Sequence, residues 1–323
     1  MADHIGIRGL HHVTAIASGA QANLDFYTRV LGLRLVKRTV NFDAPDTYHF
    51  YYGDVAGSPG SLLTFFPFAD AAPGRAGTGM AETTAFAVPE TAFEAWMTRL
   101  AADGRDFDGP TTRFGAQTLG LRDPDGLRIE LVAELGLHEA VLPGSRPDGP
   151  VPAEHAIRRL HSVALCVEAP ERTARLLTET FGYEAAGEET GRQRFRASGG
   201  GPAGIVDLLC KPDQMRGRMG AGTVHHVAFR ARDETEQLTW RETILALGFG
   251  VTPVLDRQYF RSIYFREPGG VLFEIATDPP GFATDEAPAA LGTALNLPPW
   301  LEPERAEIER RLPPLRPLRP AAA

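Results

Sequence analysis

Val224-His225-His226-Val227-Ala228-Phe229 is an apolar, strand-like segment interrupted by two histidines. Leu10-His11-His12-Val13-Thr14-Ala15-Ile16 repeats this pattern near the start of the chain. A third segment, Glu267-Pro268-Gly269-Gly270-Val271-Leu272-Phe273-Glu274-Ile275, reads as a turn followed by a strand with one carboxylate. Imidazole and carboxylate groups on buried strands are costly unless they are paired, hydrogen-bonded or bound to a cation. Two histidine strands and one glutamate strand can supply two His ligands and one carboxylate, a set that leaves positions open on a metal such as Fe(II).

These segments belong to a unit that repeats along the chain. The first copy begins with the strand Leu10–Ile16 and continues with a helix over Ala20–Leu31, which Gly32 ends. Three strand-like runs follow it, so the unit is β-α-β-β-β. Further copies begin at Thr83, Leu160 and Val224. The sequence therefore predicts four βαβββ modules.

Composition limits the classes of function. The chain has 323 residues, with 43% hydrophobic and 23% charged residues, which is typical of globular proteins. A net charge of −8 argues against nucleic acid or an anionic membrane as a main partner. Neither a signal peptide nor an apolar run of the ~18 residues that span a bilayer is evident. Cys166 and Cys210 are too far apart for a CxxC motif. We expect a cytoplasmic protein.

The module boundaries suggest a division of the chain. We expect an N-terminal pair of modules over residues 1–140, a linker over 141–157, a C-terminal pair over 158–277 and an irregular tail over 278–323. The linker is predicted from its proline and glycine content, and the tail is also rich in proline.

Several short motifs, taken in order, resemble one family. The chain resembles the vicinal oxygen chelate superfamily, which includes glyoxalase I, extradiol dioxygenases and bleomycin-resistance proteins. Within it, the chain looks most like the bacterial hydroquinone-type ring-cleaving dioxygenases. The stretches that carry this resemblance are Gly9–Thr14, Val36–Asp43, Tyr48–Tyr52, Gly57–Gly60, Val151–Ile157, Arg257–Tyr264 and Gly281–Glu286. The resemblance implies an α+β fold in which the four modules form two open, mixed, β-barrel-like sheets with helices outside.

The resemblance also implies a metal site built by modules one and four. Its ligands would be His12, His226 and Glu274, and its metal Fe(II), with Mn as an alternative. In catechol-type extradiol enzymes the first ligand comes from the third module, which would make His161 the ligand in place of His12. Module one has no carboxylate in Leu62–Phe66, where glyoxalase-type lyases usually carry a glutamate. Three protein ligands would leave room for a bidentate substrate and O₂.

In the companion pair of modules, the resemblance places the counterparts of the ligands at or beside Thr84, and at His161, Glu130 and Asp207. No histidine lies on the first strand of module two, so a second complete metal site is not expected.

Five further residues are candidates for the site. The resemblance supports a proton-donating role for Tyr264. The guanidinium of Arg257 could orient an anionic ring oxygen, although a surface salt bridge would also explain the arginine. His11 and His225 should face away from the ligands on a regular strand, so a strand irregularity would be needed to bring them near the site. Thr14 shares a face with His12 and could line the pocket or simply fill the strand. For His49, between two aromatic residues, we expect packing only.

The resemblance thus implies an Fe(II)-dependent extradiol-type dioxygenase that opens a small aromatic diol with O₂. A lyase or isomerase that uses Zn, Ni or Co on the same fold, as in glyoxalases, stays open as an alternative. So does a metal-free protein that binds an aromatic drug. The sequence chooses neither between hydroquinone and catechol nor between oligomeric states, and a homo-oligomer is compatible with it.

Overall fold

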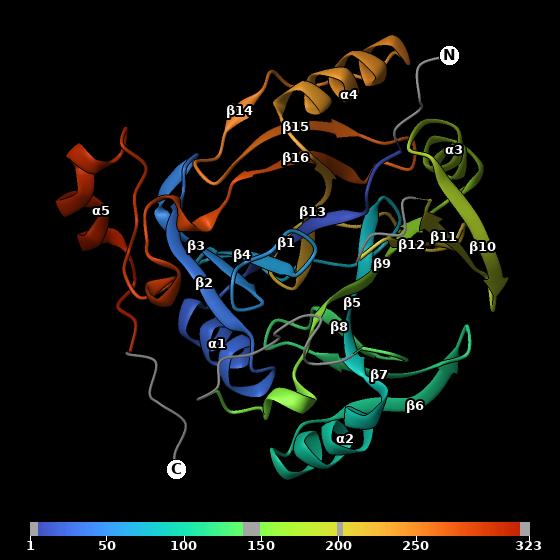
Figure 1. The fold of residues 1–323 in the computed structure, drawn as a ribbon, viewed down its shortest axis with the longest axis horizontal. Coiled ribbons are helices and arrows are strands. Elements are labelled where there is room, and N and C mark those ends of the chain that lie inside the picture. Colours follow the sequence, from blue (N-terminus) through green and yellow to red (C-terminus); the bar gives the residue numbers. More distant parts are fainter. Residues whose placement is uncertain (1–5, 138–148, 199–202, 317–323) are drawn as a thin grey trace.

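The computed structural model describes residues 6–137, 149–198 and 203–316, and it contains two open, curled, mixed sheets of eight strands each (Figure 1). The expected linker 141–157 and tail 278–323 therefore lie partly outside the described residues. Within the described residues, no helix is long and apolar enough to span a bilayer.

Sheet one contains strands of modules one and four in the order β14-β15-β16-β13-β1-β4-β3-β2. Its strands are β1 (Leu10–Ala17), β2 (Arg34–Asn41), β3 (Ala44–Gly53), β4 (Leu62–Pro67), β13 (Thr223–Ala231), β14 (Leu255–Asp256), β15 (Phe260–Arg266) and β16 (Leu272–Pro280). The first strands of the two modules, β1 and β13, pair antiparallel at its centre. The last strands, β4 and β16, flank them in parallel.

Sheet two has the same plan, built by modules two and three in the order β10-β11-β12-β9-β5-β8-β7-β6. Its strands are β5 (Met80–Pro89), β6 (Phe107–Arg113), β7 (Ala116–Arg122), β8 (Arg128–Glu134), β9 (Arg159–Val167), β10 (Tyr183–Glu189), β11 (Arg192–Ala197) and β12 (Ile205–Cys210). Again the two first strands, β5 and β9, pair antiparallel at the centre. The predicted fold class is confirmed.

Helices lie on the outside of the sheets (Figure 1). They are α1 (Ala20–Asp25), α2 (Phe93–Ala102), α3 (Glu171–Arg175), α4 (Glu234–Ala246) and α5 (Arg305–Arg311). Helices α1 and α3 each continue into a π-helical turn, over Phe26–Val30 and Leu176–Thr180. Short 3₁₀ turns occupy Glu90–Ala92, Ala153–His155, Phe282–Thr284, Pro288–Ala290 and Glu302–Glu304. Asp233 precedes helix α4 as its N-cap, and its carboxylate accepts a hydrogen bond from the backbone N–H of Glu236.

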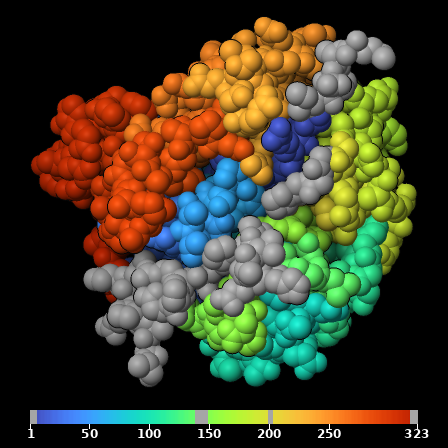
Figure 2. All heavy atoms as spheres, in the orientation of Figure 1, coloured from blue at the N-terminus to red at the C-terminus, as the bar shows by residue number. Residues whose placement is uncertain are grey.

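The described part of the segment after β16, residues 281–316, packs against sheet one. Its anchor is Lys37 on β2, whose side chain is fully buried and whose Nζ lies 2.5 Å from both Asp285 Oδ1 and Glu286 Oε2. A buried ammonium is costly unless it is paired, so this contact ties the C-terminal segment to β2. Figure 2 shows the C-terminal segment, in red, as a layer on one side of the molecule.

The central strands of both sheets are irregular at equivalent places. The pairing of β1 with β13 skips His11 on one strand and His225 on the other. The pairing of β5 with β9 skips Glu82 and His161 in the same way. A skipped residue is a β-bulge, which bends the strand and redirects the neighbouring side chains. The bulges are the irregularity needed to bring adjacent histidines together.

Candidate metal centre

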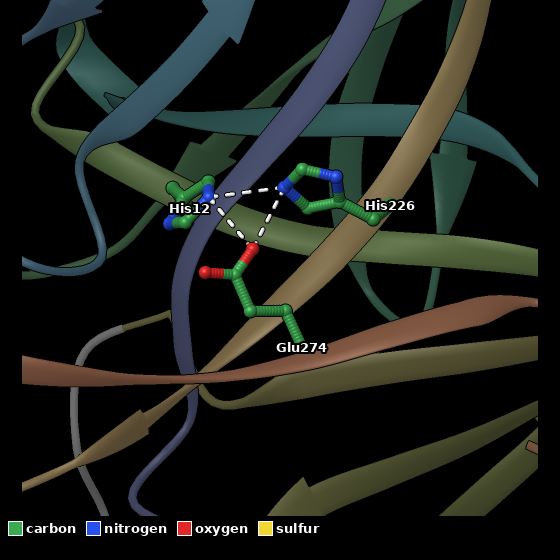
Figure 3. A group of neighbouring side chains, drawn as sticks. All are labelled: His12, His226 and Glu274. Atoms are coloured by element: carbon green, nitrogen blue, oxygen red, sulfur yellow. Dashed lines mark hydrogen bonds and ion pairs between the residues drawn. The ribbon is translucent and has the colours of Figure 1, made fainter. Parts of the chain in front are cut away.

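Three side chains from the middle of sheet one meet in its interior (Figure 3). They are His12 on β1, His226 on β13 and Glu274 on β16, and each is at least 96% buried. Nε2 of His226 lies 2.8 Å from Oε2 of Glu274, and Nε2 of His12 lies 3.3 Å from the same oxygen. The two Nε2 atoms are 3.2 Å apart. Within the described ranges, no other group of three such side chains comes this close together.

The geometry of these three atoms fits a divalent cation. Ligand atoms that share one octahedral face about 2.1 Å from an ion lie about 3.0 Å apart, whereas tetrahedral ligands lie about 3.4 Å apart. The observed separations of 2.8, 3.2 and 3.3 Å are close to these values, so the three atoms can share one ion. Oε2 of Glu274 is buried without a hydrogen bond of acceptable geometry, while Oε1 accepts one from Ser262 Oγ. A buried carboxylate oxygen in this state is stabilised by a bound cation.

The pKa shifts of His226 and Glu274 favour the same interpretation. Burial lowers the pKa of His226 below its ordinary value, although the carboxylate of Glu274 acts in the opposite direction. For Glu274, burial opposes ionisation, but the two imidazoles outweigh it and hold the pKa well below the usual range. Metal binding requires neutral imidazoles and ionised carboxylates.

The histidines beside the ligands touch them. Nδ1 of His11 lies 2.9 Å from Nδ1 of His12, and Nδ1 of His225 lies 2.8 Å from Nδ1 of His226. Burial, followed by the charge of His226, lowers the pKa of His225 to about 3, so this ring is neutral. Each neighbour can therefore hold the Nδ1 proton of a ligand histidine and leave Nε2 free for an ion.

A cavity of about 400 Å³ opens beside His12 and His226. Its wall contains mainly aromatic side chains, among them Phe42, His49, Tyr51, Phe66, Phe260 and Tyr264. This size and lining suit a small aromatic molecule.

Arg257 and Tyr264 form the polar part of the wall on the β15 side. Tyr264 pairs with Glu274 across β15 and β16, and its hydroxyl oxygen accepts a hydrogen bond of 3.4 Å from Arg257 Nε. Arg257 also pairs with Asp43, at 3.0 Å. Burial, followed by the charge of Glu274, raises the pKa of Tyr264 well above its ordinary value, so the phenol keeps its proton at neutral pH.

Thr14 and His49 exchange the places that the sequence suggested for them relative to the cavity. Thr14 is fully buried and does not line the cavity; its hydroxyl is 2.8 Å from that of Thr64. His49, for which only packing was expected, lines the cavity and has its Nε2 atom 3.0 Å from Thr64 Oγ1. A signal for His49 was available, since it is an imidazole in the module that lacks a carboxylate on its last strand.

Sheet two repeats the backbone of this centre with different side chains. The register places Thr83 where sheet one has His12, and Ser162 where it has His226. His161, expected as the counterpart of a ligand, is instead the bulged residue before Ser162 and donates to or accepts from the Ser162 hydroxyl at 3.0 Å. That expectation is corrected because the bulge shifts the ligand position by one residue.

The two carboxylates of sheet two that were expected as counterparts of ligands are neutralised by arginines. Asp207, at the position of Glu274, accepts hydrogen bonds of 2.9 Å from Arg192 and, through both oxygens, from Arg194. Glu130 pairs with Arg113 at 2.7 Å. Guanidinium groups thus supply the positive charge that the carboxylates need.

Comparison with known sequences gives consistent results. The family model of the Glyoxalase/Bleomycin resistance protein/Dioxygenase superfamily matches residues 9–131 and 159–275. The protein named "Putative ring-cleaving dioxygenase MhqO" from Bacillus subtilis (strain 168) is 47% identical over 309 residues, which cover 95% of this chain and 96% of the relative. The chlorohydroquinone/hydroquinone 1,2-dioxygenase of Sphingobium indicum is 33% identical over 314 residues, which cover 95% and 96%.

Solved structures agree. The crystal structure of a candidate dioxygenase from Bacillus subtilis superimposes with a TM-score of 0.90 at 44% identity, and the match covers 96% of this chain and 98% of that one. Glyoxalase I from Zea mays shares the fold, with a TM-score of 0.59 at 14% identity over 84% of this chain and 92% of that one. The chain therefore belongs to the glyoxalase, bleomycin resistance protein and dioxygenase superfamily.

Proposed function

We propose that this protein is an Fe(II)-dependent, extradiol-type dioxygenase that opens the ring of a hydroquinone or catechol with O₂. The main support is the position of the His12, His226 and Glu274 group at an aromatic-lined cavity with an arginine and a tyrosine in its wall. The names of the relatives favour the same reaction class. Bound iron would supply open positions at which the diol and O₂ react.

The side chains of the chain itself would bind and orient the diol. The phenyl rings of Phe66 and Phe260 offer an apolar surface for the aromatic ring and exclude water. The guanidinium of Arg257 carries a permanent charge that attracts an ionised ring oxygen. The hydroxyl of Tyr264 keeps its proton at neutral pH and can donate it where negative charge develops.

Module one favours oxygenation over the lyase reaction. In the glyoxalase-type lyases that this chain resembles, a second glutamate usually comes from the last strand of that module. Here the register of β4 against β1 places Thr64 at the position that Glu274 has on β16. Its hydroxyl contacts Thr14 and His49, so it is already engaged in hydrogen bonds.

Protein purified without oxygen and analysed for metals tests the proposal. We expect iron to bind in a one-to-one ratio, and hydroquinone or catechol to consume one O₂ per ring, with both atoms of isotopically labelled O₂ in the product. A redox-inert metal together with turnover of a thiol adduct would instead identify a lyase. Binding of aromatic compounds without metal would identify a sequestering protein.

A further inference from the structure

The two halves of sheet one are related position by position. Thr64 on β4 corresponds to Glu274 on β16, and each has a tyrosine opposite it on the next strand, Tyr51 for Thr64 and Tyr264 for Glu274. Two residues before each tyrosine lies the side chain that hydrogen-bonds to this position. In module four it is Ser262 Oγ, which donates to Glu274. In module one it is an imidazole, and an imidazole can do more than a serine hydroxyl.

That imidazole belongs to His49, which is held firmly. Its Nε2 atom is 3.0 Å from Thr64 Oγ1, which in turn is 2.8 Å from Thr14 Oγ1. The His49 ring lies against Tyr51 and Phe66, with centroids 4.0 and 4.3 Å away. Of the two ring nitrogens of His49, only Nε2 has a hydrogen-bond partner among the described residues. The other ring nitrogen, Nδ1, is available to a molecule in the cavity that His49 lines.

The side of the cavity that His49 lines differs in charge from the side that Arg257 lines. Burial is the main reason that the pKa of His49 is well below its ordinary value, so the ring is neutral and one nitrogen accepts while the other donates. Arg257, on the β15 side, is cationic and can only donate. Strands β3 and β15 lie on opposite sides of the central pair β1 and β13. The cavity therefore has a cationic donor on one side and a neutral imidazole on the other.

A singly ionised diol matches these two sides. One of its oxygens is an anion, which the metal group and Arg257 attract, and its other oxygen is a hydroxyl with a proton to donate. We propose that His49 is a substrate-binding residue that accepts a hydrogen bond from the hydroxyl which the diol retains. This inference rests on the proposed function and makes it more specific. It assigns the cavity to aromatic rings with two free hydroxyls and disfavours monohydric phenols and methyl ethers.

Equilibrium binding without O₂ tests this role separately from turnover. Hydroquinone and its monomethyl ether are titrated into the iron-loaded protein, because the ether lacks the second proton. We expect wild-type protein to bind hydroquinone roughly three- to tenfold more tightly, the value of one neutral hydrogen bond. In His49→Phe, which keeps a ring against Tyr51 and Phe66, this ratio should fall to about one. His49→Gln, which can accept a hydrogen bond, should restore part of it.

His161→Phe is the matched control. His161 is also a buried histidine with one hydrogen bond to a hydroxyl, but it lies in sheet two, so its loss should leave the ratio unchanged. Circular dichroism and iron content confirm that each variant is folded and loaded. If His49→Phe fails to fold, Thr64→Val removes the hydroxyl that holds the imidazole, and the ratio should again fall.

The outcomes separate the two proposals. A wild-type ratio that persists in His49→Phe, or in the Thr64→Val variant that replaces it, overturns the role of His49 and leaves the dioxygenase proposal standing. A wild-type protein that binds hydroquinone and the ether equally well also overturns it. If the wild-type protein binds iron but no diol, the proposed function itself is wrong.

Discussion

Nδ1 of His225 lies 2.8 Å from Nδ1 of His226, although the two residues are neighbours on one strand. On a regular strand their side chains would point to opposite faces. The β-bulge at His225 brings the two rings together, and the equivalent bulge at His11 does the same for His12. Of two Nδ1 atoms in such a contact, one carries the proton. When Nε2 of His226 faces a cation, Nδ1 keeps its proton and donates it to His225.

His225→Phe is expected to weaken iron binding by about 10- to 100-fold, the usual cost of losing a partner that orients a ligand histidine. His225→Asn, which can still accept a hydrogen bond, should lose less. Competition with a chelator measures both. Equal iron affinity in wild-type protein and His225→Phe would show that the contact is only packing.

Replacement of Glu274 by Gln should remove iron from the protein without unfolding it. The amide has the shape of the carboxylate but no charge for a hard cation, and it can still accept from Ser262. Iron per chain and the circular dichroism spectrum are the measurements. Full iron occupancy in Glu274→Gln would refute the ligand assignment.

The choice of modules is tested by two histidines. His12→Ala should abolish iron binding, whereas His161→Ala should leave it almost unchanged, since His161 lies in sheet two beside Ser162. Both side chains are buried, so each variant loses a comparable volume. The reverse result would move the centre to modules three and four.

For Tyr264→Phe we expect normal iron content, a modest change in KM and a fall in kcat of ~10²–10³, the typical cost of losing one donor to a developing charge. The ring and its contact with His226 remain. Single-turnover kinetics are needed to establish that chemistry limits the rate. A wild-type kcat under those conditions would make Tyr264 a packing residue.

Acid should destabilise the metal-free protein. Burial lowers the pKa of His161 and of His225 to about 3 in the folded state, against about 6.5 in an unfolded chain. The unfolded chain therefore binds more protons below pH ~6.5, and the stability present above this pH is lost as the pH falls, by about 1.4 kcal/mol per pH unit for each histidine. Denaturant midpoints across this range measure the slope. His161→Leu should reduce the slope by about one proton, and a midpoint independent of pH would contradict the expectation.

Much of the fold could be predicted because its pattern is local. Alternation in Leu10–Ile16 and the glycine after the first helix define a module without reference to the rest of the chain. The order of helix and strands within each module followed from the repeat. The type of helix was not predicted, since Ala20–Leu31 contains both α1 and a π-helical turn. A single turn with i→i+5 hydrogen bonds is too short to leave its own period in the apolar pattern.

The site was predictable only in part. The two pairs of adjacent histidines and Glu274 stand out because polar groups on apolar strands require a partner. The choice of His12 and His226 within these pairs came from the family resemblance. The bulges at His11 and His225 were not predictable, because they depend on how two strands 214 residues apart align. His49 was missed although its imidazole lies in the module without a carboxylate on its last strand. Its flanking residues, Tyr48 and Phe50, describe an aromatic strand, and its role depends on Thr64 on the next strand.

The strands of sheet two lie in the sequence between the two halves of sheet one, and this sets the order in which the two sheets are synthesised. All eight strands of sheet two lie between β4 and β13 in the sequence, so they leave the ribosome before β13, the antiparallel partner of β1, has been made. Nascent domains fold from the N-terminus as they emerge, and an unpaired strand edge invites aggregation. The strand that carries His12 therefore belongs to an incomplete sheet one while all strands of sheet two are translated. If His12, His226 and Glu274 hold a metal, as we propose, loading has to wait until Glu274 on β16 has emerged.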